Sequence, residues 1–133
     1  MTLRRSQLNL RCPAESEYVA PVRHALGAFL AALEFERQSL DDVTTAAGEA
    51  LANIVEHAYR RSPETAERYL QLLAKIDAAG TLSLVVSDGG TFIERPPVKG
   101  RGFGLRIMRA IAGSLNIDTS EGTCVRMTFR AKR

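Results

Sequence analysis

The sequence predicts an α/β fold, a two-layer sandwich in which one mixed, mainly antiparallel sheet is covered by helices on one face. Three observations lead to this prediction. Apolar residues recur at helical spacing early in the chain, apolar stretches later flank turn signals, and a glycine-rich segment separates two such hairpins. At 133 residues the chain has the size of one domain, so we expect a single domain over residues 1–133.

The chain begins with a strand and a helix. Residues 7–12 alternate polar and apolar side chains, as a half-buried strand does, and Pro13 ends the alternation. Residues 15–36 carry apolar side chains at three- and four-residue steps, which is typical of an amphipathic helix. Pro21 falls in the early turns of this helix, where a missing N–H costs least.

A second helix and a hairpin follow. Ser39 or Asp41 can cap the helix, which its apolar positions extend to about Tyr59. The face of this helix is long and rich in alanine, so we expect it to pack flat against the sheet. Two apolar stretches, 69–76 and 82–86, then flank a turn-like Ala-Ala-Gly and predict a hairpin.

The last third of the chain is a loop, a helix and a second hairpin. Residues 88–104 are rich in Gly and Pro and predict a loop. A third helix is expected over 105–112, with Gly113 as its stop. Residues 115–119 and 123–129 then predict the closing hairpin around a Glu-Gly turn.

The composition is that of a soluble globular protein, with 45% hydrophobic and 25% charged residues. The net charge is +3 and the basic residues cluster near the two ends, which favours a solvated surface and attraction to an acidic ligand or partner over nucleic-acid binding. No apolar run approaches the roughly 18 residues of a membrane helix. Cys12 and Cys124 lack metal or redox spacing, so we expect reduced, buried thiols in a cytoplasmic protein, with a disulfide between adjacent strands as the less favoured alternative.

The first motif that indicates chemistry is EALANIVEHAY at residues 49–59. Glu49, Asn53 and His57 are four residues apart and therefore lie along one face of a helix. A carboxylate can accept a proton from a hydroxyl, and an amide oxygen can bind a hard cation such as Mg²⁺. A solvated helix face explains this motif equally well when it is taken alone.

The second motif is VVSDGGTF at residues 85–92, in which an apolar strand leads into an acid and two glycines. A ligand can approach such a backbone closely. Asp88, at the end of a buried strand, is suited to accept a hydrogen bond from the exocyclic amine of adenine. The alternative is a simple turn, because Asp-Gly pairs commonly form turns.

The third motif is KGRGFGLRIMRAI, in which Gly100, Gly102 and Gly104 lead into a helix. Backbone N–H groups at such a helix start form an anion site, and Lys99 and Arg101 add positive charge beside it. The spacing matches neither the phosphate loop of P-loop proteins nor a dinucleotide fingerprint.

In this order, the three segments resemble the N box and the two glycine boxes of the ATPase and kinase superfamily that includes gyrase, histidine kinases and MutL. That superfamily has the Bergerat fold. The chain is most similar to the anti-sigma-factor serine/threonine kinases, because the first motif ends in His57, Ala58 and Tyr59 and because GRGFGLRIMRAI closely matches their second glycine box. The resemblance spans essentially the whole chain and includes Gly122 and Thr123 in the last hairpin.

This resemblance implies roles for individual residues. Glu49 would be the general base, Asn53 the Mg²⁺ ligand, and Asp88 and Thr123 the residues that read adenine. His57 is not expected to bind a metal, because no second His or Cys lies at ligand spacing. The other positions expected near the nucleotide are His57, Gly90, Lys99, Gly100, Arg101, Gly102, Phe103, Gly104 and Leu105.

Two features depart from the family pattern. The first glycine box usually reads DxGxG, and here Phe92 replaces its last glycine. The segment that would cover the phosphates, between Thr91 and Gly100, is only a few residues long and includes Pro96 and Pro97. A short lid makes nucleotide binding a firmer expectation than rapid turnover.

The resemblance implies an enzyme that uses ATP and Mg²⁺ to phosphorylate a serine or threonine of an anti-sigma-factor antagonist of the STAS type. In such a pathway the same domain also sequesters a sigma factor, and a homodimer is expected. Direct binding to nucleic acid or to a membrane is not. The alternative, favoured by the short lid, is a nucleotide-gated binding module with little or no phosphotransfer.

Overall fold

The computed structural model describes residues 6–61, 69–88, 103–118 and 123–130, and of residues 57–61 and 103–105 it describes the backbone alone. The elements follow the order expected from the sequence, with one short 3-10 helix added. Their bounds are β1 (Ser6–Pro13), η1 (Ser16–Tyr18), α1 (Val19–Ala32), α2 (Arg37–Arg61), β2 (Tyr69–Ile76), β3 (Leu82–Asp88), α3 (Phe103–Ile111), β4 (Ser114–Asp118) and β5 (Cys124–Phe129).

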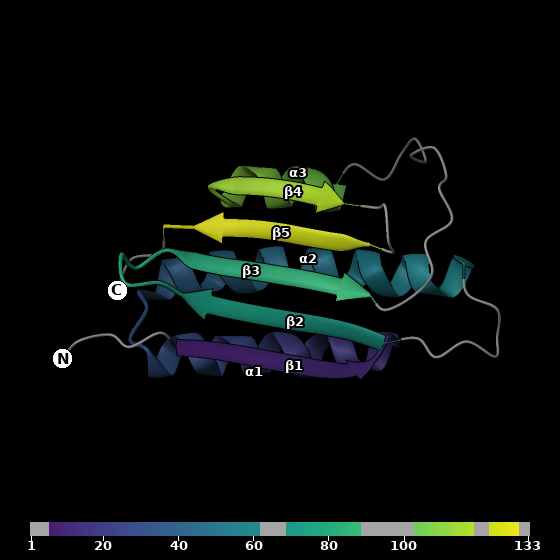
Figure 1. The fold of residues 1–133 in the computed structure, drawn as a ribbon, viewed down its shortest axis with the longest axis horizontal. Helices are drawn as coiled ribbons and strands as arrows, with labels where there is room; N and C mark the ends of the chain where they lie inside the picture. Colours follow the sequence, from purple (N-terminus) through teal and green to yellow (C-terminus); the bar gives the residue numbers. More distant parts are fainter. Residues whose placement is uncertain (1–5, 62–68, 89–102, 119–122, 131–133) are drawn as a thin grey trace.

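The five strands form one sheet in the order β1-β2-β3-β5-β4. Helices α1, α2 and α3 all lie on one face of this sheet (Figure 1). The two-layer α/β sandwich and both hairpins are therefore confirmed. Every pairing between the described strands is antiparallel, whereas the sequence predicted a mixed, mainly antiparallel sheet.

The core lies between the sheet and the helix layer. Alternate residues of β2 and β3 point into it, and Leu70, Leu72 and Leu84 are fully buried there. The small side chains of α2, such as Ala47 and Ala50, are also fully buried and allow this central helix to lie close to the strands. Each buried leucine contributes about 1.5–3 kcal/mol to stability.

The first helix is shorter than the sequence predicted. Its end is set by Glu34, which has a left-handed φ of 63°. The N–H of Phe35 donates to the carbonyl of Leu30 at 3.1 Å and that of Glu34 to the carbonyl of Ala31 at 3.0 Å, while the buried Phe35 follows directly. This is a Schellman motif, which is usually signalled by a glycine that this chain lacks at that position.

The other two helices start earlier than the sequence predicted. Helix α2 begins at Arg37, before the predicted caps Ser39 and Asp41, and it continues past Tyr59 to Arg61. Helix α3 begins at Phe103 and ends two residues before Gly113, whose N–H donates to the carbonyl of Thr128 at 2.8 Å. Helix ends depend on such contacts, so these boundaries were the least predictable part of the fold.

The two cysteines lie on different strands and are half-buried rather than buried. Cys12 is in β1 and Cys124 in β5, and β2 and β3 lie between them in the sheet. A disulfide between adjacent strands is therefore excluded, and partial burial raises the pKa of the Cys12 thiol. Within the described ranges, no helix combines the length and the hydropathy needed to cross a membrane.

The β2–β3 hairpin closes with a turn that requires a glycine. The Oδ1 atom of Asp77 accepts hydrogen bonds from the N–H groups of Ala79 and Thr81, both at 2.9 Å. Gly80 has a φ of +87°, and a Cβ at this position would meet nothing within 4 Å. The cost of any side chain at Gly80 is therefore conformational rather than steric.

We predict that Gly80→Ala lowers the free energy of unfolding by about 1 kcal/mol, the typical cost of a left-handed residue that has a Cβ. Urea denaturation of the two proteins measures this difference. Gly80→Asn is the matched control, because asparagine tolerates the left-handed region, and it should cost less than alanine. Equal stability of the alanine variant and the parent protein would contradict the assignment of strain to this turn.

Candidate functional site

Asp88 and Thr123 meet at one end of the sheet, where β3 ends and β5 begins. The N–H of Asp88 donates to the carbonyl of Thr123 at 3.0 Å, and the N–H of Thr123 donates to Oδ1 of Asp88 at 3.2 Å. The side chain of Thr123 is buried and only 6% exposed, while Asp88 is half-buried. The antiparallel register of β3 and β5 brings these two residues together although they are 35 positions apart.

This pair has the chemistry to recognise a planar heterocycle. The carboxylate of Asp88 is held in place by a backbone N–H, and a carboxylate offers about four lone-pair positions for hydrogen bonds. The neighbouring hydroxyl of Thr123 can both donate and accept. A ring that carries an exocyclic amine beside an acceptor nitrogen is the complement of this arrangement.

The N-box residues lie on α2, the central helix behind the sheet. Glu49 and Asn53 are both half-buried and one turn apart. The C-terminal part of α2 lies at the same end of the sheet as the end of β3 (Figure 1). The backbone of His57 continues this helix, and its side chain lies outside the described part of the chain.

The second glycine box lies only partly within the described residues. Lys99, Gly100, Arg101 and Gly102 of this box lie outside them, as does Gly90 of the first glycine box, so their predicted roles stay predictions.

Helix α3 starts where this box ends. Phe103, Gly104 and Leu105 form its first turn, and their side chains are not described. The N-terminus of α3 lies at the same end of the sheet as the end of β3 (Figure 1). The positive end of the helix dipole is therefore on the same side of the molecule as Asp88.

A groove beside Glu49 was not predicted from the sequence. It has a volume of about 430 Å³ and lies between α1 and α2. Arg23 of α1 and Gly48 of α2 line it together with Glu49, and a Cβ on Gly48 would lie 3.3 Å from Cδ of Arg23. A glycine inside a helix lowers its stability. Gly48 in α2 was therefore the available sequence signal that another side chain packs close to the helix at this position.

The donor set of α2 suits a cation that is already bound to phosphates. Among the described residues, no three His, Cys, Asp or Glu side chains are grouped to hold a metal ion. Mg²⁺ keeps several waters and needs only one or two protein oxygens when phosphates supply others. The amide oxygen of Asn53 fits that requirement.

Comparison with known proteins identifies the family to which this fold belongs. The model of the family described as Histidine kinase-like ATPase domain matches residues 12–129. The Anti-sigma F factor of Bacillus cytotoxicus is 25% identical over 134 residues, which cover 93% of this chain and 92% of the relative. The Serine-protein kinase RsbW of Bacillus cereus is 27% identical over 100% of this chain and 90% of the relative.

Solved structures share the fold. The RsbU and RsbW domains of a Mycobacterium tuberculosis protein match with a TM-score of 0.77 at 22% identity, over 96% of this chain and 33% of that chain. A histidine kinase domain from Erythrobacter litoralis matches with a TM-score of 0.60 at 18% identity, over 89% of this chain and 61% of that chain.

The family resemblance drawn from the three motifs is therefore confirmed. The family model covers nearly all of the chain, including every described strand except part of β1. The chain belongs to the histidine kinase-like ATPase domain family.

Proposed function

We propose that this protein is an ATP-dependent serine/threonine protein kinase that acts as an anti-sigma factor in a partner-switching pathway. Its substrate would be a STAS-type antagonist protein, and its regulatory target a sigma factor. The names of the similar curated proteins, Anti-sigma F factor and Serine-protein kinase RsbW, support this role. We expect the protein to act in the cytoplasm and as a homodimer, as the family resemblance implies.

The observation that supports nucleotide binding best is the convergence at one end of the sheet. The Asp88–Thr123 pair, the C-terminal part of α2 and the N-terminus of α3 all lie there. Adenine would bind at Asp88 and Thr123, with its amine donating to the carboxylate. The phosphates would extend toward the start of α3, where the helix dipole favours negative charge.

The proposed transfer step uses two residues of α2. Asn53 would hold the Mg²⁺ that neutralises the phosphate oxygens. Glu49 would accept the proton of the acceptor hydroxyl while the hydroxyl oxygen bonds to the γ-phosphorus and the bond from that phosphorus to ADP breaks.

A groove beside Glu49 supports the proposal that a protein substrate reaches this residue. The groove between α1 and α2 opens to solvent, and the half-buried Glu49 is one of the residues that line it. A serine on a protruding loop could therefore approach Glu49 without entering the core.

Transfer of radiolabel from ATP to a candidate antagonist protein tests the proposal. Label on a serine or threonine of the antagonist supports the kinase. Binding of Mg-ATP and of the antagonist without any transfer would instead support the nucleotide-gated binding module, which the short segment between Thr91 and Gly100 favours.

We predict that Asn53→Ala weakens Mg-ATP binding about tenfold, equivalent to ~1.4 kcal/mol, and leaves the fold intact. The side chain is half-buried on the helix surface, so its removal costs little packing. Calorimetry with and without EDTA measures the effect, which should vanish when Mg²⁺ is absent. Gln38→Ala, which removes an exposed amide from the same helix, is the matched control. Unchanged Mg-ATP affinity would refute the role of Asn53.

A further inference from the structure

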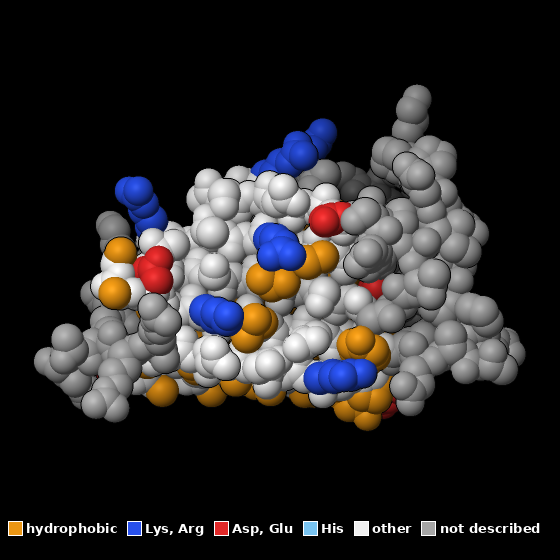
Figure 2. Space-filling view, in the orientation of Figure 1, with side chains coloured by type: hydrophobic (Ala, Val, Ile, Leu, Met, Phe, Trp, Pro, Cys, Tyr) orange, Lys and Arg blue, Asp and Glu red, His pale blue; other side chains and the backbone are white. Residues whose placement is uncertain are grey.

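The face of the sheet that α1, α2 and α3 leave uncovered carries charges of both signs, and we call it the open face (Figure 2). It consists of the strand residues that alternate with the buried ones. Leu73 of β2 and Val85 of β3 lie opposite each other at its centre and are half-buried. The exposed charged residues on this face and at its ends include Arg11, Lys75, Asp77, Asp118, Arg126 and Arg130.

Two of these charges lie in one row across the sheet, at its opposite edges. Arg11 of β1 aligns with Gln71, which aligns through Ser87 and Cys124 with Asp118 of β4. Neighbouring strands lie about 4.8 Å apart, so roughly 19 Å separates Arg11 from Asp118. These two side chains therefore cannot pair with each other within one copy of the chain, although they lie equally far from β3, the middle strand.

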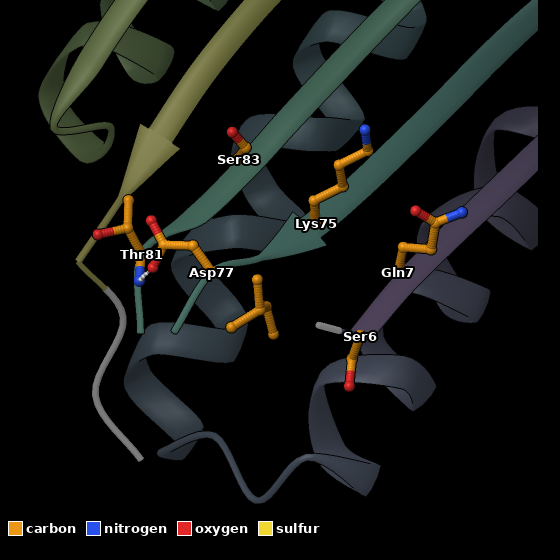
Figure 3. Close-up of a pocket in the computed structure, with 7 residues that line it drawn as sticks. Ser6, Gln7, Lys75, Asp77, Thr81 and Ser83 are labelled. Atoms are coloured by element: carbon orange, nitrogen blue, oxygen red, sulfur yellow. Dashed lines mark hydrogen bonds between the residues drawn. The ribbon is translucent and has the colours of Figure 1, made fainter. Parts of the chain in front are cut away.

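A second pair of opposite charges lies at the hairpin end of the open face. Asp77 follows β2 and Arg130 follows β5, so these residues also lie on either side of β3. Asp77 lines a pocket of about 400 Å³ there, beside Thr81 (Figure 3). Its Oδ1 accepts hydrogen bonds from the N–H groups of Ala79 and Thr81, and a carboxylate has further lone pairs for another partner. Within the described part of the chain, Asp77 and Arg130 do not form an ion pair with each other.

A second copy of the chain can bring both pairs together. If the two open faces pack on each other about a twofold axis along β3, β1 of one copy lies over β4 of the other, and β2 lies over β5. Arg11 then faces Asp118 of the second copy, and Asp77 faces Arg130 of the second copy. Because the axis repeats each contact, every opposite-charge pair forms twice.

The remaining positions in this arrangement bring no like charges together. Lys75 faces the neutral Thr128 of the second copy, and Arg126 faces its Leu73. At the centre, Val85 packs on Val85 of the second copy. An apolar centre within a polar and charged rim is typical of protein interfaces.

Other arrangements and other occupants fit these charges less well. An axis that runs across the strands through the same centre would place β5 on β5, so that Arg126 of one copy meets Arg126 of the other, and like charges cost binding energy. An acidic protein segment or a nucleic acid would meet the carboxylates of Asp77 and Asp118. The charges of the open face therefore select a second copy whose β3 runs parallel to that of the first.

We propose that two copies of this chain associate through their open faces, with the two β3 strands parallel. This inference deepens the proposed function, because it names the surface of the homodimer expected there. Packed sheets lie about 10 Å apart, which an arginine and an aspartate from facing sheets can span together. Five strands about 4.8 Å apart and about 20 Å long cover roughly 500 Å² per copy, the size of a weak, reversible interface.

This arrangement keeps both proposed active sites accessible. The helix layers lie on the outer sides of the pair, so each groove beside Glu49 stays open to a substrate. Because the two β3 strands run parallel, the Asp88–Thr123 pairs of both copies lie at the same end of the dimer.

Sedimentation equilibrium of the full chain tests the proposal through a charge swap. Arg11→Glu alone should weaken dimerisation about tenfold, because each dimer then has two pairs of facing carboxylates in place of ion pairs. Asp118→Arg alone should weaken it to a similar extent, through two pairs of facing guanidinium groups. An equimolar mixture of the two variants should form a heterodimer with close to the parental affinity, because both facing pairs then combine an acid with a base.

Arg109→Glu on α3 is the matched control. Arg109 is exposed on the helix side of the sheet, and its replacement changes the net charge as much as Arg11→Glu does. Dimerisation of this variant should stay within about twofold of the parent, since solvent and salt screen a charge so far from the interface.

Several results would overturn the proposal. A parent chain that stays monomeric at its highest soluble concentration, or single variants that dimerise like the parent, would exclude the open face as a dimer surface. A mixture that fails to dimerise would exclude the parallel arrangement. A monomeric parent whose amide resonances in β2, β3 and β5 shift when a candidate antagonist is added would assign the face to a different protein.

Calorimetry with Mg-ATP keeps this proposal separate from the proposed function. The monomeric Arg11→Glu variant should bind Mg-ATP with the parental affinity, because β1 lies at the edge of the sheet and away from the Asp88–Thr123 pair. A parent chain that dimerises but does not bind Mg-ATP would contradict the nucleotide site and support the dimer surface.

Discussion

Replacing Glu49 by glutamine is expected to slow phosphotransfer to the acceptor protein about 10²- to 10⁴-fold, the usual contribution of a general base. Glutamine keeps the shape of the side chain but cannot accept the proton of the attacking hydroxyl. Because Glu49 is half-buried at a groove on the helix surface, the fold and the affinity for Mg-ATP should change little. Single-turnover transfer of radiolabelled phosphate measures the rate.

The matched control for this experiment is Asp41→Asn on the same helix. Asp41 forms an exposed ion pair with Arg37 at 3.3 Å, and such pairs contribute at most about 1 kcal/mol. This variant should transfer phosphate at the parental rate. If Glu49→Gln also retained that rate, Glu49 would not be the base, and the groove between α1 and α2 would have another purpose.

Replacing Asp88 by alanine is expected to weaken ATP binding about ten- to a hundredfold, because a hydrogen bond to a charged group contributes about 1.5–3 kcal/mol. The same change should remove the preference for ATP over GTP, since the carboxylate is the proposed acceptor for the amine of adenine. It also leaves the N–H of Thr123 without the partner that Asp88 provides. Calorimetry with both nucleotides measures the two effects.

Ser87→Ala is the control for the loss of Asp88. Ser87 precedes Asp88 in β3, and its side chain points to the open face rather than toward the helix layer. Its replacement should leave the affinity for ATP unchanged. Circular dichroism should first show that Asp88→Ala keeps the fold. If this variant then has the parental affinity for ATP and the parental nucleotide preference, adenine binds elsewhere.

Much of the fold was predictable because its signals are local. The apolar stretches 69–76 and 82–86 and the Ala-Ala-Gly turn between them predicted the β2–β3 hairpin, and the register confirms it. The alanine-rich face of α2 predicted close packing on the sheet, and Ala46, Ala47 and Ala50 are fully buried. Side chains at these spacings lie on one face of their element, whatever the rest of the chain does.

The end of α1 was not predictable in this way. The sequence predicted a helix through residue 36, but the chain turns at Glu34 in the left-handed region. Burial of Phe35 against the core favours this turn although Glu34 has a Cβ. Tertiary packing therefore outweighed the local preference of the residue.

By itself, the sequence determined the order of the elements, the three motifs and the family resemblance. Only the tertiary structure decided which of these residues meet. The sheet order places β5 beside β3 and so joins Thr123 to Asp88, and the packing of α1 on α2 places Arg23 beside Glu49. Periodicity along a chain describes one element at a time, whereas these contacts depend on how separate elements bury their apolar faces against each other.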